Sequence, residues 1–145
     1  MITRQTLDCY EYLKDELEFD NDMIKEVFEN HDQGEFDFEV NDYRFIHKDH
    51  IDEIMKDELL SDEYVLGCFT AWFIADILGE STGLTYQDIE DMQKAEQYSA
   101  LGRMLSKHID EVQKKYVSCD GYGHHFAHYD GNEHESGEYY IFRIN

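Results

Sequence analysis

The sequence predicts an α+β domain in which about five helices, one of them buried at the centre, accompany a small antiparallel sheet made of two hairpins. Apolar residues recur at helical spacing over most of the 145 residues, whereas the stretches 36–46 and 122–144 have the pattern of strands around a turn. Hydrophobic residues make up 41% and aromatic residues 14% of the chain, which is enough for a core. A single domain spanning residues 1–145 is therefore expected.

Two helices are expected in the N-terminal region. The first runs from about Thr6 to Phe19, because Tyr10, Leu13 and Leu17 fall on one helical face. The second is shorter and covers about Asn21 to Asn30. Its expected buried positions are Met23, Ile24, Val27 and Phe28.

The next segment predicts the first hairpin. Phe36, Phe38 and Val40 alternate along the chain, and Asn41 with Asp42 then provides a turn before a second strand, Tyr43 to Ile46. Alternation around an Asn-Asp pair indicates a hairpin, although Asn-Gly would be the stronger signal.

A helix capped by Asp49 is expected next, with apolar positions Ile51, Ile54 and Met55. The segment from Ser61 to Gly79 is apolar nearly all round, and a helix with apolar residues on every side is usually buried. We expect it to be the central core helix, capped by Ser61 and ended by Gly79.

A helical pattern then runs to Tyr116. It starts with Thr85, and Asp88 three residues later completes a capping-box pattern. The apolar spacing allows one long helix or two helices broken near Gly102.

The C-terminal segment is expected to form the second hairpin, with strands Tyr122–Tyr129 and Tyr139–Ile144 around a glycine-rich turn. Histidines gather here, close to Cys119 and Asp130; they are His124, His125, His128 and His134. On a strand, His124 and His128 would share one face and His125 would point to the other. This division and the solitary cysteine do not match the paired spacing of zinc sites.

No catalytic or cofactor signature is found. The chain has no phosphate-binding loop, no dinucleotide-binding glycine pattern and no nucleophile elbow. Two acidic stretches, from Asp20 and from Asp130, begin like calcium-binding loops but lack glycine at the sixth position. We expect no enzyme, no catalytic residue, no metal and no cofactor.

The three cysteines, Cys9, Cys68 and Cys119, are odd in number and widely spaced, which indicates reduced thiols. The N-terminal segment lacks the apolar core of a signal peptide, and the longest apolar run, 64–79, is too short and too charged to span a bilayer. A cytoplasmic protein with no membrane contact is expected.

The charge is the strongest feature of the sequence. There are 34 acidic against 12 basic residues, for a formal net charge of −22. The acid is concentrated between Asp8 and Glu63, which excludes a direct nucleic-acid ligand because phosphate binding needs a basic face. A stripe of five acids at spacings of three and four residues is expected opposite the apolar seam of the first helix; it consists of Asp8, Glu11, Asp15, Glu18 and Asp22.

Further acids prolong this stripe, and together they make up the expected partner-binding surface: Asp8, Glu11, Asp15, Glu18, Asp22, Glu26, Glu29, Asp32, Glu35, Asp37 and Glu39. Like charges at these helical spacings cost a few tenths of a kcal/mol per pair, so their repetition indicates a use.

In size, charge and lack of a catalytic motif, the chain resembles the small acidic inhibitors of phages and mobile elements, namely the DNA-mimic antirestriction proteins and the acidic anti-CRISPR proteins. The resemblance implies binding to a basic nucleic-acid-binding protein, such as a nuclease or a CRISPR or restriction complex, and allows for a homodimer. Two alternatives stay open. One is a metal-binding protein or small enzyme centred on the C-terminal histidine and tyrosine hairpin. The other is an acidic surface that serves only solubility.

Overall fold

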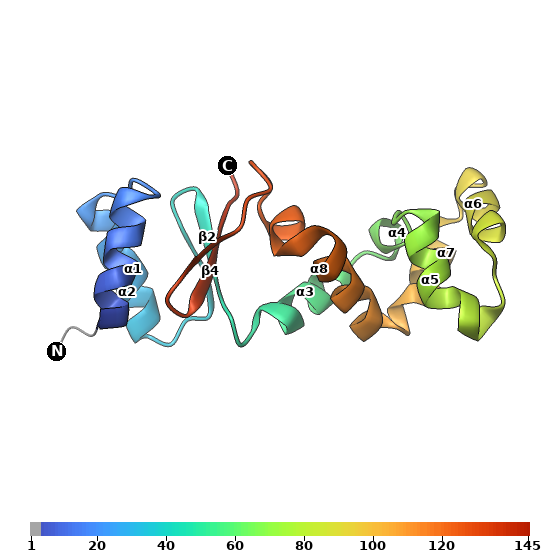
Figure 1. The fold of residues 1–145 in the computed structure, drawn as a ribbon, viewed down its shortest axis with the longest axis horizontal. Coiled ribbons are helices and arrows are strands. Elements are labelled where there is room, and N and C mark those ends of the chain that lie inside the picture. The colour runs from blue at the N-terminus through green and yellow to red at the C-terminus, as the bar shows by residue number, and fades with distance from the viewer. Residues whose placement is uncertain (1–3) are drawn as a thin grey trace. The chain divides into compact units, whose positions relative to one another are not determined.

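The computed structural model describes residues 4–145, with side chains from Asp8 onward, and it is α+β as predicted (Figure 1). The described residues form eight helices, not about five as expected, because the long predicted segments are divided, and one four-stranded sheet. The elements are α1 Arg4–Asp15, α2 Asn21–Asp32, β1 Asp37–Val40, β2 Tyr43–His47, α3 Ile51–Leu60, α4 Glu63–Leu66, α5 Ala71–Thr82, α6 Tyr86–Lys94, α7 Tyr98–Ser106, α8 Ile109–Phe126, β3 His134–Ser136 and β4 Tyr139–Arg143.

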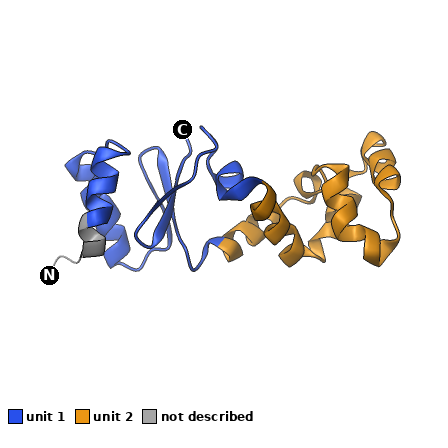
Figure 2. Ribbon diagram, in the orientation of Figure 1, with its two compact units in different colours: residues 1–51, 120–145 blue, residues 52–119 orange. Residues whose placement is uncertain are grey.

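The chain divides into two compact units, one made of residues 1–51 and 120–145 and the other of residues 52–119 (Figure 2). The first unit holds the sheet with α1, α2 and the end of α8. The second holds the remaining helices. Whether residues 1–145 behave as one domain stays a prediction.

The sheet consists of two antiparallel hairpins, as predicted, in the order β1-β2-β4-β3. Asn41 has a φ of 53° and closes the first hairpin, so the Asn-Asp turn is confirmed. Val40 pairs with Tyr43 on either side of this turn.

The predicted strand Tyr122–Tyr129 is wrong, because residues 122–126 are helical and β3 begins only at His134. The chain kinks at Gly121, where φ is 77°, and then resumes the helix. The loop that follows packs tightly against this turn: a Cβ at Gly123 would lie 2.4 Å from the carbonyl oxygen of Gly131. These tertiary contacts override the alternation that indicated a strand.

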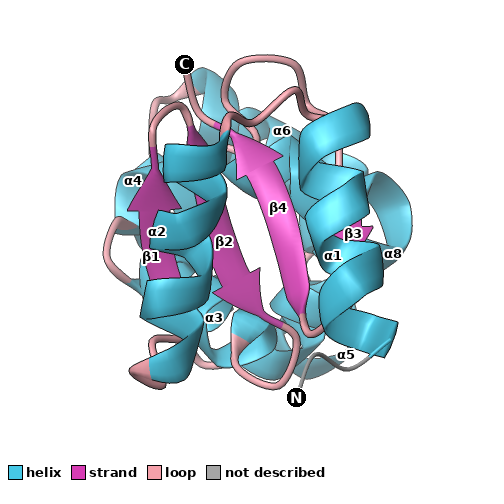
Figure 3. Cartoon of the chain, turned by 90° about the vertical axis from the view of Figure 1, so that its left-hand side faces the viewer, coloured by secondary structure: helices cyan, strands magenta, loops and turns pink. Residues whose placement is uncertain are grey.

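Helices α1 and α2 cover one face of the sheet (Figure 3). Strand residues on this face alternate with residues on the other, as the pleat requires. The buried core between helices and sheet consists of Leu13, Leu17, Phe19, Ile24, Val27, Phe38, Val40, Phe45, Tyr139 and Ile141.

The end of α8 contacts the opposite face of the sheet. The rings of Phe126 and Phe142 lie 5.1 Å apart, and the guanidinium of Arg44 lies 5.1 Å from the Phe126 ring. Phe126, Phe142 and Ile46 are almost fully buried. The first unit is therefore a sheet with apolar side chains on both faces.

The predicted helix Ser61–Gly79 is two helices, α4 and α5, in the second unit. Thr70 interrupts it because its hydroxyl accepts a hydrogen bond from the Phe73 N–H and so caps α5. Helix α5 continues past Gly79 and ends at Gly83, where φ is 74°. Trp72 is 71% exposed, so a single buried central helix is not confirmed.

The pattern from Thr85 to Tyr116 forms three helices, α6, α7 and the start of α8. The capping box at its start is confirmed: the Thr85 hydroxyl accepts from the Asp88 N–H at 3.1 Å, and the Asp88 carboxylate accepts from the Thr85 N–H at 2.9 Å. The first break includes Glu96, whose φ is 59°.

Gly102 does not break a helix but lies inside α7, where α4 approaches closely. A Cβ at Gly102 would lie 1.7 Å from the carbonyl oxygen of Glu63, and one at Gly67 would lie 1.8 Å from that of Tyr98. Both glycines therefore allow the backbones of α4 and α7 to pack closely, and a side chain at either position would overlap the other helix.

We predict that Gly102→Ala lowers the free energy of unfolding by about 1–3 kcal/mol, because the methyl group would overlap the α4 backbone. Urea unfolding followed by circular dichroism measures this. The matched control is Gly79→Ala in α5, where the nearest atom would be 3.4 Å away and where alanine should be neutral or stabilising. Equal stability of the two variants would contradict the close packing.

Candidate protein interface

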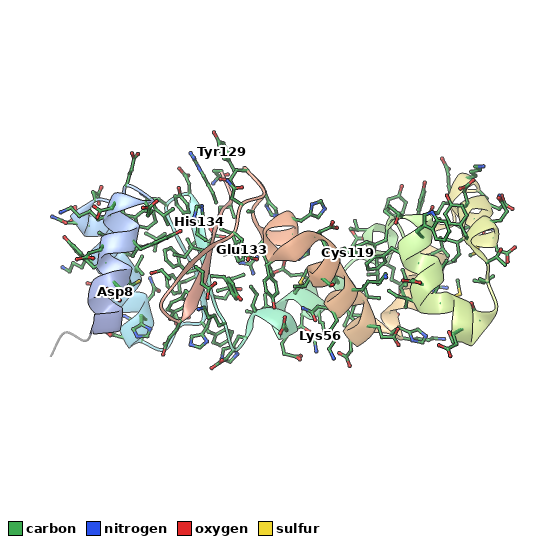
Figure 4. The ribbon with its side chains drawn as sticks, in the orientation of Figure 1. Asp8, Lys56, Cys119, Tyr129, Glu133 and His134 are labelled. Carbon is green, nitrogen blue, oxygen red and sulfur yellow. The ribbon has the colours of Figure 1, made fainter. Side chains whose placement is uncertain are left out.

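Helix α1 carries the first part of the predicted acidic stripe. Asp8, Glu11 and Asp15 are all exposed, whereas Leu13 is completely buried against the sheet. The three acids therefore lie on the face of α1 turned away from the core, and Figure 4 labels Asp8 on this helix.

The stripe does not continue along one helix, because α1 ends at Asp15. Glu18 lies in the connection with a φ of 58°, and Asp22 belongs to the first turn of α2. The prediction of a single row from Asp8 to Asp22 is therefore wrong.

Two local features cause this break. Leu17 and Phe19 are buried, and the Phe19 N–H donates to the Leu13 carbonyl at 2.9 Å, which turns the chain back toward the core. Asp20 then starts α2, since its carboxylate accepts from the Met23 N–H at 2.9 Å.

A second row lies on α2. Its exposed acids are spaced by four, three and three residues; they are Asp22, Glu26, Glu29 and Asp32. Ile24 and Val27, which are buried, mark the opposite face. At a rise of ~1.5 Å per residue this row extends over about 15 Å. The sequence pattern predicts these acids as a continuation of the first stripe, whereas they form a row of their own on α2.

The acids near β1 differ from one another. Glu35 and Glu39 are exposed. Asp37 is half-buried, and both of its oxygens accept hydrogen bonds from Arg44 at 2.8 Å. Its charge is therefore largely used within the sheet.

Few cations oppose the two helical rows. Between Asp8 and Asp32 the chain has ten acids and only two basic residues, Lys14 and Lys25. Lys25 lies 3.9 Å from Glu29, and both side chains are well exposed, so this pair contributes little. The outer faces of α1 and α2 thus form one strongly negative surface, which we call the acidic helix face.

Contacts between α1 and β3 hold this face in place. The Tyr12 hydroxyl is hydrogen bonded to Nδ1 of His134 at 2.9 Å, and the two rings meet edge to face. Burial raises the pKa of both Cys9 and Tyr12 above their ordinary values, so both stay neutral near pH 7.

The C-terminal histidines do not share one strand. His124 and His125 lie on the end of α8, His128 lies in the loop that follows, and His134 lies on β3. The expected sharing of one strand face by His124 and His128 is therefore wrong. In the part of the chain that the structure describes, no three His, Cys, Asp or Glu side chains are grouped so as to hold a metal.

The structure brings together a different group of histidines, which the sequence did not predict. His31 at the end of α2 contacts the Tyr139 hydroxyl at 3.1 Å, and Nε2 of His47 lies 3.5 Å from the Glu138 carboxylate. These residues come from three distant segments, so no local pattern could have indicated them. They join α2 to the sheet.

No protein-family model, no curated protein and no solved structure matches the chain. Within residues 4–145, none of the helices combines the length and the apolar character that crossing a membrane requires.

We predict that Tyr12→Phe lowers the free energy of unfolding by about 1 kcal/mol, since it leaves the half-buried Nδ1 of His134 without its partner. The control is Tyr10→Phe on the same helix, whose exposed hydroxyl contacts Asn21 at 3.3 Å and should contribute less than about 0.5 kcal/mol. Chemical denaturation measures both. Equal effects would show that Tyr12 does not fix α1 on β3.

Proposed function

We propose that the chain is an acidic inhibitory protein that binds a basic nucleic-acid-binding host protein, such as a nuclease or a CRISPR or restriction complex, as a nucleic-acid mimic. The observation that supports this most is the acidic helix face, in which two rows of exposed carboxylates stand on helices packed against a common core.

The spacing of the charges suits such a partner. Along each row a carboxylate occurs about every 5 Å of helix axis, as follows from residue steps of three and four. One strand of duplex DNA presents a phosphate every ~3.4 Å. The two charge densities are of the same order, so cationic side chains arranged for phosphates would meet carboxylates at similar intervals.

In the free protein, repulsion between neighbouring carboxylates lowers the stability of α1 and α2, and binding to a basic partner would remove this repulsion. Five neighbouring pairs of like charge lie along the two rows: Asp8–Glu11, Glu11–Asp15, Asp22–Glu26, Glu26–Glu29 and Glu29–Asp32. Each pair costs about 0.2–0.5 kcal/mol in an isolated helix. A basic groove turns this repulsion into attraction, and the negative field also speeds the encounter.

A surface made acidic only for solubility would spread its charge evenly. The N-terminal concentration of acid and the rows on α1 and α2 favour a directed role instead. The alternative of a metal-binding protein or enzyme was built on a histidine hairpin, and that hairpin strand is helical in the structure.

We predict that neutralising the α2 row with Asp22→Asn, Glu26→Gln and Glu29→Gln weakens binding to the partner by about tenfold or more. Tagged protein is used to capture partners from a bacterial lysate at low salt, and the captured protein is then titrated with each variant. The expected partner is basic, binds nucleic acid and is released at high salt.

The matched control removes the same charge from the second unit through Asp57→Asn, Glu80→Gln and Glu96→Gln, all at exposed positions. If the two triple variants bind equally, only net charge matters and the proposal is wrong. Capture of no basic nucleic-acid-binding protein would also overturn it. Loss of activity on mutating His124, His125 and His128, with no effect of the α2 changes, would favour the metal or enzyme alternative.

A further inference from the structure

Strand β1 is the terminal strand of the sheet, and in the described part of the chain only β2 pairs with it. Its backbone groups point alternately toward β2 and away from it. The His47 N–H donates to the Phe36 carbonyl at 2.8 Å, and Val40 pairs with Tyr43 across the two-residue turn. Phe36, Phe38 and Val40 therefore use their backbone groups toward β2.

The remaining two residues face outward. By this alternation, the N–H and C=O groups of Asp37 and Glu39 point away from β2, toward the open edge of the sheet. The edge ends at Glu35, because the Glu35 N–H donates to Asn30 and its carbonyl accepts from the Tyr139 hydroxyl. Among the described residues no hydrogen bond uses these four backbone groups, so an added strand could pair with them.

The side chains along this edge alternate in character. Phe38 lies on the face that α1 and α2 cover, whereas Phe36, one residue before β1, is 45% exposed and stacks its ring on His50. Asp37 and Glu39 lie on the other face; Glu39 is exposed, and Arg44, which lies opposite Glu39 in the register, donates its hydrogen bonds to Asp37. A strand added here would have apolar residues beside Phe36 and Phe38, and basic residues beside Glu39.

We propose that the open edge of β1 binds an extended basic segment of the partner, with alternating basic and apolar residues, as a fifth strand of the sheet. This rests on the proposed function in taking the partner to be basic. The added strand would fix the position of the partner segment along β1, whereas the acidic helix face attracts the partner by charge.

A second copy of the chain is the less suitable occupant. Pairing β1 with itself would place acids of one copy beside acids of the other, and each chain carries a net charge of −22. Like charges opposite one another destabilise a strand pair. A positively charged segment relieves this repulsion.

The test uses a short synthetic peptide of alternating lysine and valine, so it does not depend on finding the natural partner. Glu39→Pro removes one outward N–H and leaves the ladder to β2 intact, since that N–H does not point to β2. Glu39→Gln is the matched control, because it removes the charge and keeps the N–H. We expect proline to weaken peptide binding about fivefold beyond the effect of glutamine.

A second measurement needs no variant. Nuclear magnetic resonance of the wild-type chain should show slowed hydrogen exchange at the Asp37 and Glu39 amides when the peptide binds. A peptide N-methylated along one edge should bind more weakly, because it cannot form the ladder.

Equal binding by Glu39→Pro and Glu39→Gln, together with equal binding of the methylated peptide, would show attraction by charge alone and overturn the proposal. No peptide binding, or a homodimer that Glu39→Pro dissociates, would overturn it too. These outcomes leave the α2 capture experiment unaffected, so a failure of the edge and a failure of the proposed function can be told apart.

Discussion

The packing of α1 and α2 on the sheet is the interaction on which the acidic helix face depends. Leu13, Ile24 and Val27 are almost fully buried there. Full burial of such a side chain contributes about 1.5–3 kcal/mol, whereas each like-charge pair on the outer face costs about 0.2–0.5 kcal/mol. The core term is the larger, so both helices stay packed on the sheet despite the repulsion, and the backbone positions that carry the carboxylates are fixed.

Fixed carboxylates differ from the same charges on a disordered tail. A tail loses conformational freedom when it binds, and this loss reduces its affinity. On α1 and α2 that freedom has already been lost in folding, and the hydrogen bond between Tyr12 and His134 helps to hold α1 against β3. The two proposed contacts, the acidic helix face and the β1 edge, contribute to binding in different ways. The helical rows attract over a long range, and the β1 edge selects for extended shape at short range.

Local pattern was a good guide where neighbouring residues decide the structure. The Asn41 turn and the Thr85–Asp88 capping box were predicted because each depends on residues within a few positions. The predictions that were wrong concern segments whose structure depends on tertiary contacts. Buried Leu17 and Phe19 end the first helix early, and the loop packed on Gly123 keeps residues 122–126 helical. The sequence allowed a helix break near Gly102, but this glycine lies inside α7 and permits the close approach of α4, which only the fold reveals.

We propose that the acidic helix face occupies the site where a basic partner binds nucleic acid. Displacement of fluorescent duplex DNA from the captured partner tests it most directly. We expect full competition between the chain and the DNA, with the affinity of the partner for the chain falling as the salt concentration rises. A ternary complex, in which the partner holds DNA while saturated with the chain, would contradict it.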